Sequence, residues 1–132
     1  MPPLPADSNE IEAIMHELGV IIEIVNTVQK LCEEEGIERV HSLVLQVGEV
    51  SSVVPRFLEE CYPAAVDGSF MRDTKLIIET VPANALCRSC NRIYRVLDNP
   101  NQDKSICPAC SSEETELLSG REFNIKEIIV PE

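Results

Sequence analysis

The sequence contains no tryptophan, and its 132 residues include only three phenylalanines and two tyrosines. A core built from this chain must therefore be mainly aliphatic, which an apolar content of 44% allows. Charged residues interrupt every hydrophobic stretch, so no segment is long and apolar enough to cross a bilayer. These absences exclude a membrane-spanning protein. The length indicates one compact domain, or one domain with a small appendage.

Basic residues are scarce, with 11 Lys and Arg against 23 Asp and Glu and a net charge of -12. Because binding to nucleic acid needs clustered Lys and Arg, this balance argues against a nucleic-acid partner. The charge suits cation handling or a basic protein partner, although most acidic surface only aids solubility. The first eight residues lack the basic and apolar regions of a signal peptide, so we expect a cytoplasmic protein.

Motifs for catalysis are absent as well. The chain has two histidines, and neither a Ser/His/Asp set, a Cys/His set in a motif context nor a glycine-rich phosphate loop occurs. His41 stands close to Arg39 at the start of a predicted strand and is interpreted as a surface residue. The sequence therefore predicts a protein that is not an enzyme.

Two closely spaced cysteine pairs are present, Cys87-Arg-Ser-Cys90 and Cys107-Pro-Ala-Cys110. Each CxxC can form a tight turn that directs two sulfurs at one centre, and two such turns supply the closed tetrahedron of structural zinc. The surrounding segment, residues 83–119, is too small to fold around its own core, so metal binding would supply the missing folding free energy. A site closed by four sulfurs leaves no position for a substrate.

Other interpretations of the cysteines are weaker but not all excluded. Iron in a rubredoxin-like site competes with zinc, because four thiolates bind both metals. A thioredoxin-type redox motif is disfavoured, since it needs one CxxC at a helix start and not two facing pairs. Cys32 and Cys61 stand alone inside apolar helical patterns and are predicted to be buried core residues.

The remaining sequence predicts an α+β fold, with two helices on a small three-stranded mixed sheet and an inserted four-cysteine zinc-ribbon module. Strands are expected at residues 41–48, 75–82 and 122–131, the last with a bulge near Lys126 where its alternation changes phase. In the first strand Leu43, Leu45 and Val47 share one face, and Val44 and Gln46 lie on a less buried one.

Both predicted helices show apolar residues at intervals of three and four. The first is expected to end at Gly36 and to bury Leu18, Ile21, Ile22, Val25, Val28, Leu31 and Cys32. The second is expected to begin at Pro55 and to bury Phe57, Leu58, Cys61, Tyr62 and Ala65. Pro63 should kink or shorten this second helix.

A family resemblance follows from motifs that occur in a fixed order: Met15-His16-Glu17-Leu18, an amphipathic helix, a strand ending in Val47-Gly48-Glu49, and the CxxC ribbon. Together they resemble the HypA/HybF family of hydrogenase nickel-incorporation metallochaperones. The resemblance implies delivery of Ni(II) during maturation of nickel-iron hydrogenase. It implies three partners: the hydrogenase large-subunit precursor, a HypB-type GTPase and, in some bacteria, urease accessory proteins.

The resemblance also implies a division of the chain into three parts. Residues 1–14 form an N-terminal extension, residues 15–82 and 120–132 form an α/β nickel-binding domain, and residues 83–119 form the zinc ribbon. In the family, Met-His-Glu is the N-terminus, and nickel is bound by the imidazole and backbone nitrogens, often with the terminal amine. The matching positions imply His16 as a nickel ligand with Glu17 in support. Glu49 is either an acid near nickel or a polar residue that ends a strand.

The extension conflicts with this ligand set. Ile11, Ile14 and Met15 continue the apolar helix face backwards, and residues 7–10 resemble a capping box, so a helix is expected here. His16 would then lie on a polar stripe with its backbone nitrogen bonded inside the helix. Either translation begins at Met15, or the imidazole binds nickel with nearby carboxylates. Two other functions stay open: a zinc-ribbon protein-interaction adaptor without nickel binding, and a rubredoxin-like electron carrier.

Overall fold

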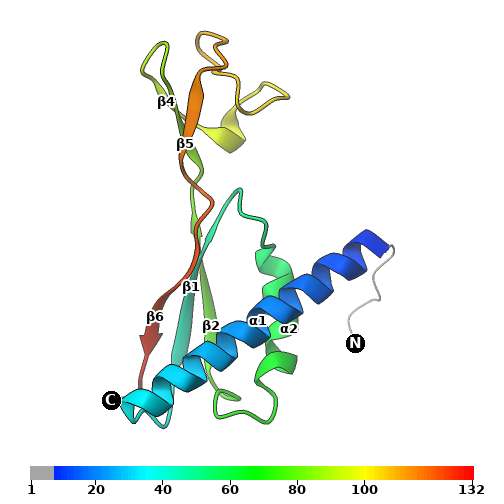
Figure 1. The fold of residues 1–132 in the computed structure, drawn as a ribbon, viewed down its shortest axis with the longest axis vertical. Coiled ribbons are helices and arrows are strands. Elements are labelled where there is room, and N and C mark those ends of the chain that lie inside the picture. The colour runs from blue at the N-terminus through cyan, green and yellow to red at the C-terminus, as the bar shows by residue number, and fades with distance from the viewer. Residues whose placement is uncertain (1–7) are drawn as a thin grey trace. The chain divides into compact units, whose positions relative to one another are not determined.

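The computed structural model describes residues 8–132, which divide into two compact units. The first unit contains residues 8–45, 53–78 and 125–132, and the second contains residues 46–52 and 79–124. The elements in chain order (Figure 1) are α1 (Ser8–Glu35), β1 (Ser42–Gly48), α2 (Pro55–Val66), β2 (Lys75–Val81), β3 (Asn84–Cys87), β4 (Ile93–Arg95), the 3-10 helix η1 (Val96–Asp98), β5 (Thr115–Ser119) and β6 (Phe123–Ile129). Within residues 8–132, no helix has the length and apolar character that a bilayer span requires.

The larger sheet is mixed, with the strand order β2-β1-β6. The N–H of His41 donates to the carbonyl of Ile129 and the N–H of Gly48 to that of Glu122, both at 2.7 Å, so β1 and β6 are antiparallel. Along the other edge of β1, the bonded residues of β1 and β2 advance in the same direction, so this pair is parallel. The helix α2 makes the crossover between the two parallel strands. The predicted α+β fold with two helices and a mixed sheet is confirmed.

The helix α1 runs without a break through Met15, as predicted, but Ile11 and Met15 are 44% and 66% exposed, so the expected apolar face is not buried there. Its buried positions recur at three and four residues and are Glu17, Ile21, Val25, Val28 and Cys32. The prediction was wrong for Ile22 and Leu31, which are 41% and 42% exposed. Each neighbours a buried position, and one step along a helix turns a side chain by about 100°, away from the buried stripe. The predicted capping box includes Asp7, which lies outside the described residues.

The end of α1 is a Schellman motif, as the glycine at its end predicts. Gly36 adopts a φ of 70°, and its N–H donates to the carbonyl of Glu33. The N–H of Ile37 donates to the carbonyl of Cys32 at 2.8 Å, which closes the wider loop of the motif.

The central strand β1 carries the most deeply buried residues of the sheet. Leu43, Leu45 and Val47 are fully buried as predicted. Val44 was expected on a less buried face, but only 5% of it is exposed. At this position β1 is therefore covered on both faces, and only Gln46 is partly accessible.

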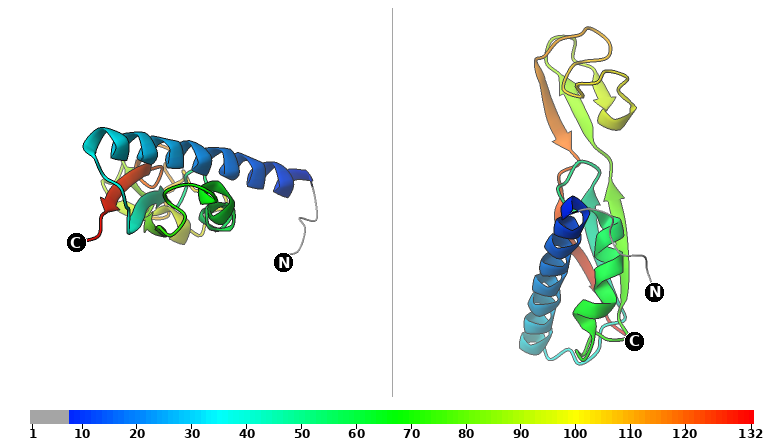
Figure 2. Two further views of the ribbon diagram at one scale, coloured as in Figure 1. Left: turned by 90° about the horizontal axis from the view of Figure 1, so that it is seen from below. Right: turned by 90° about the vertical axis from the view of Figure 1, so that its right-hand side faces the viewer.

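The helix α2 begins with Pro55, as predicted, and buries Phe57, Leu58, Cys61, Tyr62 and Val66. Ala65, expected on this face, is only half-buried. The helix continues through Pro63 to Val66, so the expected shortening did not occur, and the kink stays a prediction. The two helices lie side by side (Figure 2), and the thiol of Cys61 donates to the carbonyl of Ile14 in α1 at 3.5 Å.

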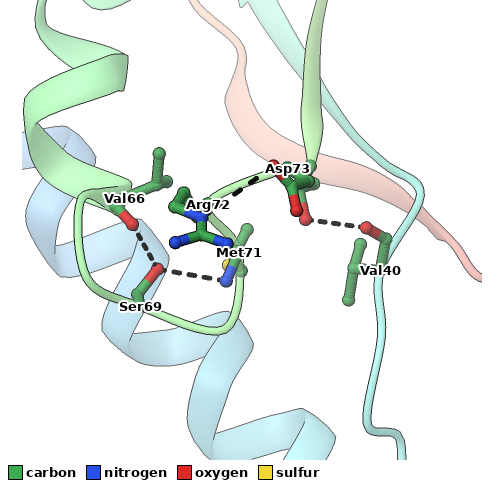
Figure 3. Close-up of polar contacts among 7 residues, drawn as sticks. Val40, Val66, Ser69, Met71, Arg72 and Asp73 are labelled. Carbon is green, nitrogen blue, oxygen red and sulfur yellow. Dashed lines mark hydrogen bonds and ion pairs between the residues drawn. The ribbon is translucent and has the colours of Figure 1, made fainter.

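A turn of residues 67–74 joins α2 to β2, and side-chain hydrogen bonds fix its course (Figure 3). The hydroxyl of Ser69 donates to the carbonyl of Val66 at 2.7 Å and accepts the N–H of Met71 at 3.1 Å. The buried hydroxyl of Thr74 donates to the carbonyl of Val40, also at 2.7 Å. The start of β2 is thereby fixed against the segment that leads into β1.

The alternation of exposure along β6 breaks where predicted, but Val130, expected on the inner face with Ile128, is 45% exposed. Ile125 and Ile128 are half-buried, and both Lys126 and Glu127 between them are exposed. The bulge that would produce this change stays a prediction.

The second unit contains the predicted ribbon, residues 83–119, and an antiparallel sheet in the order β4-β3-β5. Ala85 of β3 lies opposite Tyr94 of β4 and Leu117 of β5. The buried core of this sheet consists of three small residues, Ala83, Ala85 and Val96, with Val50, Tyr94 and Leu117 half-buried against it. Such a core stabilises little by itself, since the burial of small side chains removes little apolar area from water.

Candidate metal centres

The four ribbon cysteines converge on one point. The Sγ atoms of Cys87, Cys90, Cys107 and Cys110 all lie within 4.8 Å of one another. The Sγ atoms of Cys87 and Cys110 are 3.5 Å apart, and those of Cys90 and Cys107 are 3.7 Å apart. A tetrahedron with Zn–S bonds of about 2.3 Å has S–S edges of about 3.8 Å, so the donors fit a tetrathiolate metal ion. Among residues 8–132, no other group of three or more His, Cys, Asp or Glu side chains converges in this way.

The two CxxC turns have the same backbone geometry. In the first, the N–H of Cys87 donates to the carbonyl of Arg92 at 2.9 Å, and its carbonyl accepts the N–H of Asn91 at 2.8 Å. The corresponding bonds of Cys107 are 3.0 and 2.9 Å long. Asn91 and Ser111, which follow the two pairs, adopt left-handed φ values of 61° and 63°. The CxxC spacing predicts the turns, but nothing in the sequence marks Ser111 as left-handed.

The pKa values of ribbon thiols are shifted by their hydrogen bonds, their burial and the neighbouring sulfurs. The backbone N–H of Cys90 is the main cause that lowers the pKa of Cys87, to about 6. Burial raises the pKa of Cys107, but the N–H groups of Cys110 and Ala109 outweigh it, and the pKa falls. The N–H of Ser112 lowers the pKa of Cys110, yet hydrogen bonding to Cys87 and its neighbours raises it to about 12. Four thiolates this close need a cation between them, because like charges otherwise keep one sulfur protonated.

The helix α1 places His16 and Glu17 in contrasting environments. The imidazole of His16 is 56% exposed, on the predicted polar stripe with the exposed Glu12 and Glu23. Glu17 is only 1% exposed. The Nδ1 of His16 lies 2.7 Å from the Oε1 of Glu17. The Oε2 of Glu17 is buried without a hydrogen-bond partner among the described residues.

A buried carboxylate oxygen without a partner is uncommon and unfavourable, and it needs an explanation such as an ion or a functional role. Sequence reasoning singled out Glu17 through the family motif alone. Its burial could also have been inferred, because Glu17 stands four residues before the apolar Ile21 on the same helix face.

The backbone near His16 offers no metal ligands in this helix. The amide nitrogens of residues 15–17 are bonded to carbonyls four residues earlier. Cys61 packs against the neighbouring turn, and burial raises the pKa of its thiol, with further contributions from Glu60 and Glu17. Cys32 is buried as well, and both lone cysteines are core residues as predicted.

The Val47-Gly48-Glu49 motif makes close contacts inside the second unit. A Cβ at Gly48 would lie 1.9 Å from the carbonyl oxygen of Gly120. The Oε1 of Glu49 accepts the N–H of Ala83 at 3.2 Å and the guanidinium of Arg95 at 2.9 Å. Of its two interpretations, these bonds favour a residue that closes the end of a strand.

Asn99 was missed in the sequence, although it organises a loop of the ribbon. Only 3% of it is exposed. Its Nδ2 donates to the carbonyls of Lys104 and Ile106, at 3.2 and 2.8 Å, and its Oδ1 accepts the N–H of Asn101 at 3.0 Å. The Asn-Pro dipeptide at 99–100 is a turn signal that could have indicated this position.

These sites define the class of this chain: a small metal-binding protein with a closed tetrathiolate site and a helical His–Glu pair. Comparison with known families narrows the class further. The family described as "Hydrogenase/urease nickel incorporation, metallochaperone, hypA" matches residues 15–130. The chain belongs to this family, as its sequence motifs predict.

Individual proteins that resemble this chain support the same family assignment. "Hydrogenase maturation factor HypA" of Streptomyces avermitilis is 36% identical over 112 residues, which cover 84% of this chain and 83% of the relative. The protein of the same name from a Picosynechococcus species is 32% identical over 116 residues, covering 88% of this chain and 99% of the relative. The solution structure of "the Ni metallochaperone HypA from Helicobacter pylori" covers 86% of this chain and 96% of its own, with a TM-score of 0.58. At 17% identity, that structure supports the fold alone.

Proposed function

We propose that this metallochaperone carries Ni(II) on α1, with His16 as a ligand and Glu17 in support, for insertion into nickel-iron hydrogenase. The observation that carries the proposal is the buried Glu17 carboxylate, which has one oxygen beside the His16 imidazole and the other without a partner among residues 8–132. A cation bound at the imidazole would compensate this buried negative charge. The proposed role is transport of a metal and not catalysis.

The mode of binding depends on where the chain begins. In the continuous helix, the ligands are side chains, because the amide nitrogens near His16 are hydrogen-bonded. In a chain that begins at Met15, the terminal amine becomes free, and nitrogen donors in a plane suit Ni(II). The two forms should differ in affinity and in absorption spectrum.

The second metal is structural zinc at Cys87, Cys90, Cys107 and Cys110. Four sulfurs close the coordination sphere, which is typical of structural zinc and leaves no position for cargo. In this proposal residues 83–119 form the zinc ribbon, and residues 15–82 with 120–132 form the nickel-binding domain. Metal analysis separates zinc from iron, and ferric tetrathiolate is red whereas the zinc form is colourless.

The protein partners of this chain are proposed from the distribution of its charged residues. Residues 1–82 contain fifteen acidic and five basic residues. A hydrogenase large-subunit precursor or a HypB-type GTPase would dock on this part in the cytoplasm, and urease accessory proteins would be further partners. Steering between opposite charges predicts an association rate that falls as salt rises. A rate independent of salt would mean that the acidic surface only keeps the chain soluble.

The nickel site is tested by calorimetry and electronic absorption on the full chain and on a form that begins at Met15. We expect His16→Ala to abolish the strong site. Glu17→Gln should weaken nickel binding by about 10- to 100-fold, the usual cost of losing a group that supports a ligand. His41→Ala is the matched control, because His41 is an exposed histidine in the same chain whose Nδ1 bonds to Ser42.

Two results would overturn the assignment. If neither form binds nickel better than its His16→Ala variant, the central residue is lost, and a zinc-ribbon adaptor without nickel binding replaces the proposal. If His41→Ala weakens binding as much as His16→Ala, the loss reflects histidines in general and not the pair on α1.

A further inference from the structure

The second unit contains a hollow whose floor is apolar. It is open to solvent, has a volume of about 330 Å³ and lies over Ala85 and Val96 of the small core. Val50, Tyr94 and Leu117 line it and are only half-buried, so apolar surface of the core faces the hollow. A hollow of this kind, with a few polar groups at its edge, is the usual form of a binding site.

The charged residues of the hollow are all positive. Lys104 and Arg121 line it, together with the hydroxyl residues Ser105 and Thr115, and no acidic side chain does. This is unusual for a chain with 23 acidic and only 11 basic residues. The hollow therefore has a sign of charge opposite to that of the protein as a whole.

The loop that carries Lys104 is held in place before any ligand binds. The carbonyl of Lys104 accepts the Tyr94 hydroxyl at 3.0 Å and the Asn99 amide at 3.2 Å, and its ammonium donates to the carbonyl of Asn99. The hydroxyl of Thr115 donates to the carbonyl of Ser105 at 2.6 Å. A fixed loop lowers the entropy that binding must overcome.

The second cation, Arg121, is fixed through its backbone and free at its side chain. It follows Gly120, whose φ of 113° and close approach to Ala83 allow no other residue without strain. Within residues 8–132, the guanidinium of Arg121 has no ion-pair or hydrogen-bond partner, although acidic residues are abundant. By contrast, Arg88 and Arg95 are paired with Glu116 and Glu49.

From these observations we propose that the hollow binds a short peptide segment of a partner protein, in which an acidic side chain adjoins an aliphatic one. The aliphatic side chain covers the half-buried floor, and the carboxylate lies between Lys104 and Arg121. Charge complementarity selects the acidic residue, since the remainder of this acidic protein repels such a segment. The site needs no nickel and is independent of the proposed function of His16.

The test uses the full zinc-loaded chain and two blocked peptides, acetyl-Gly-Leu-Glu-Leu-Gly-amide and the same peptide with Gln in place of Glu. Titration followed by amide NMR should shift the signals of Val50, Tyr94, Lys104, Leu117 and Arg121. The Gln peptide should bind about tenfold more weakly, which corresponds to the loss of one charge-assisted contact. Equal binding of the two peptides, or no binding of the Glu peptide, would overturn the proposal.

Charge variants locate the site. Lys104→Gln and Arg121→Gln should each weaken binding of the Glu peptide by about three- to tenfold and leave the Gln peptide unaffected. Arg92→Gln is the control, because Arg92 is also an exposed ribbon arginine but does not line the hollow. Zinc content verifies the fold of each variant. An equal effect of Arg92→Gln would show general charge attraction and exclude the site.

Discussion

The two units of this protein are stabilised by different means. In the first unit, large side chains such as Ile21, Leu43, Leu45 and Leu58 are fully buried. In the second, the apolar core is Ala83, Ala85 and Val96, and the deepest groups include two thiols, Cys87 and Cys107. Burial of an aliphatic side chain of Leu size stabilises by about 1.5–3 kcal/mol, so we expect the first unit to hold together without a metal. We therefore expect the second unit to need a metal ion as part of its core.

The same contrast applies to the two metal centres. The tetrathiolate is closed by four sulfurs, with Cys87 and Cys107 buried, Cys90 half-buried and Cys110 exposed, and a closed coordination sphere suits an ion that must stay. The proposed nickel ligand His16 lies on an exposed helix face, which suits an ion that must leave. The two centres thus differ in closure: four sulfurs surround one ion, whereas the proposed nickel ligand is a single accessible imidazole.

The largest expected effect comes from removal of one ribbon thiol. Cys90→Ala should release the single bound metal ion and unfold residues 83–119, because binding to four thiolates contributes about 10 kcal/mol or more to the folding of such modules. Metal content by mass spectrometry and amide dispersion by NMR measure both effects. The signals of α1 and α2 should persist.

Leu58→Ala is the corresponding test in the first unit. It removes a fully buried side chain of the first unit and should lower its free energy of unfolding by about 2–5 kcal/mol with the metal retained. The comparison breaks down if full metal content survives loss of two ribbon cysteines, or if Leu58→Ala releases the metal.

A smaller effect on stability is expected from alanine substitution at two glycines, one in each unit. Gly48→Ala should destabilise the second unit by about 3 kcal/mol, because the new methyl group would meet the backbone of Gly120. Gly19→Ala should stabilise α1 by up to about 1 kcal/mol, since Gly19 is helical with open space around it. Urea unfolding followed by helix signal and metal release reports on each unit. If Gly48→Ala leaves the stability of the second unit unchanged, the close contact between Gly48 and Gly120 is not needed for that stability.

The smallest effect concerns alkaline pH. Burial raises the pKa of Tyr62, whose hydroxyl donates to the carbonyl of Thr74 at 2.9 Å, to about 12. Because the folded-state pKa is raised, the neutral Tyr62 hydroxyl contributes stability that is complete below the unfolded pKa of about 10. This contribution is lost as pH rises through 12.

Tyr62→Phe should therefore cost the first unit about 1 kcal/mol at neutral pH and remove this loss between pH 10 and 12. Unfolding curves across that range, compared with Tyr94→Phe in the second unit, provide the measurement. If the alkaline loss in the first unit is the same in both variants, Tyr62 is not its source.

Local patterns in the sequence determined much of this protein. The cysteine spacing predicted the ribbon, the apolar intervals predicted both helices, and Gly36 and Pro55 marked a helix end and a helix start. These features depend on neighbours within a few residues, so sequence alone carries the information. The family motifs added His16 and Glu17 as candidate ligands, which remain a prediction.

Only the tertiary structure decided features that depend on distant neighbours. Glu17 and Ile22 both fit the helical pattern, yet the charged residue is buried and the apolar one exposed. Packing between elements decides which helix residues are buried, because the periodicity of one helix defines its buried face only to within about a quarter turn. The approach of Gly48 to Gly120 likewise joins residues far apart in the chain. No local propensity encodes such contacts, because they exist only when the two segments pack together.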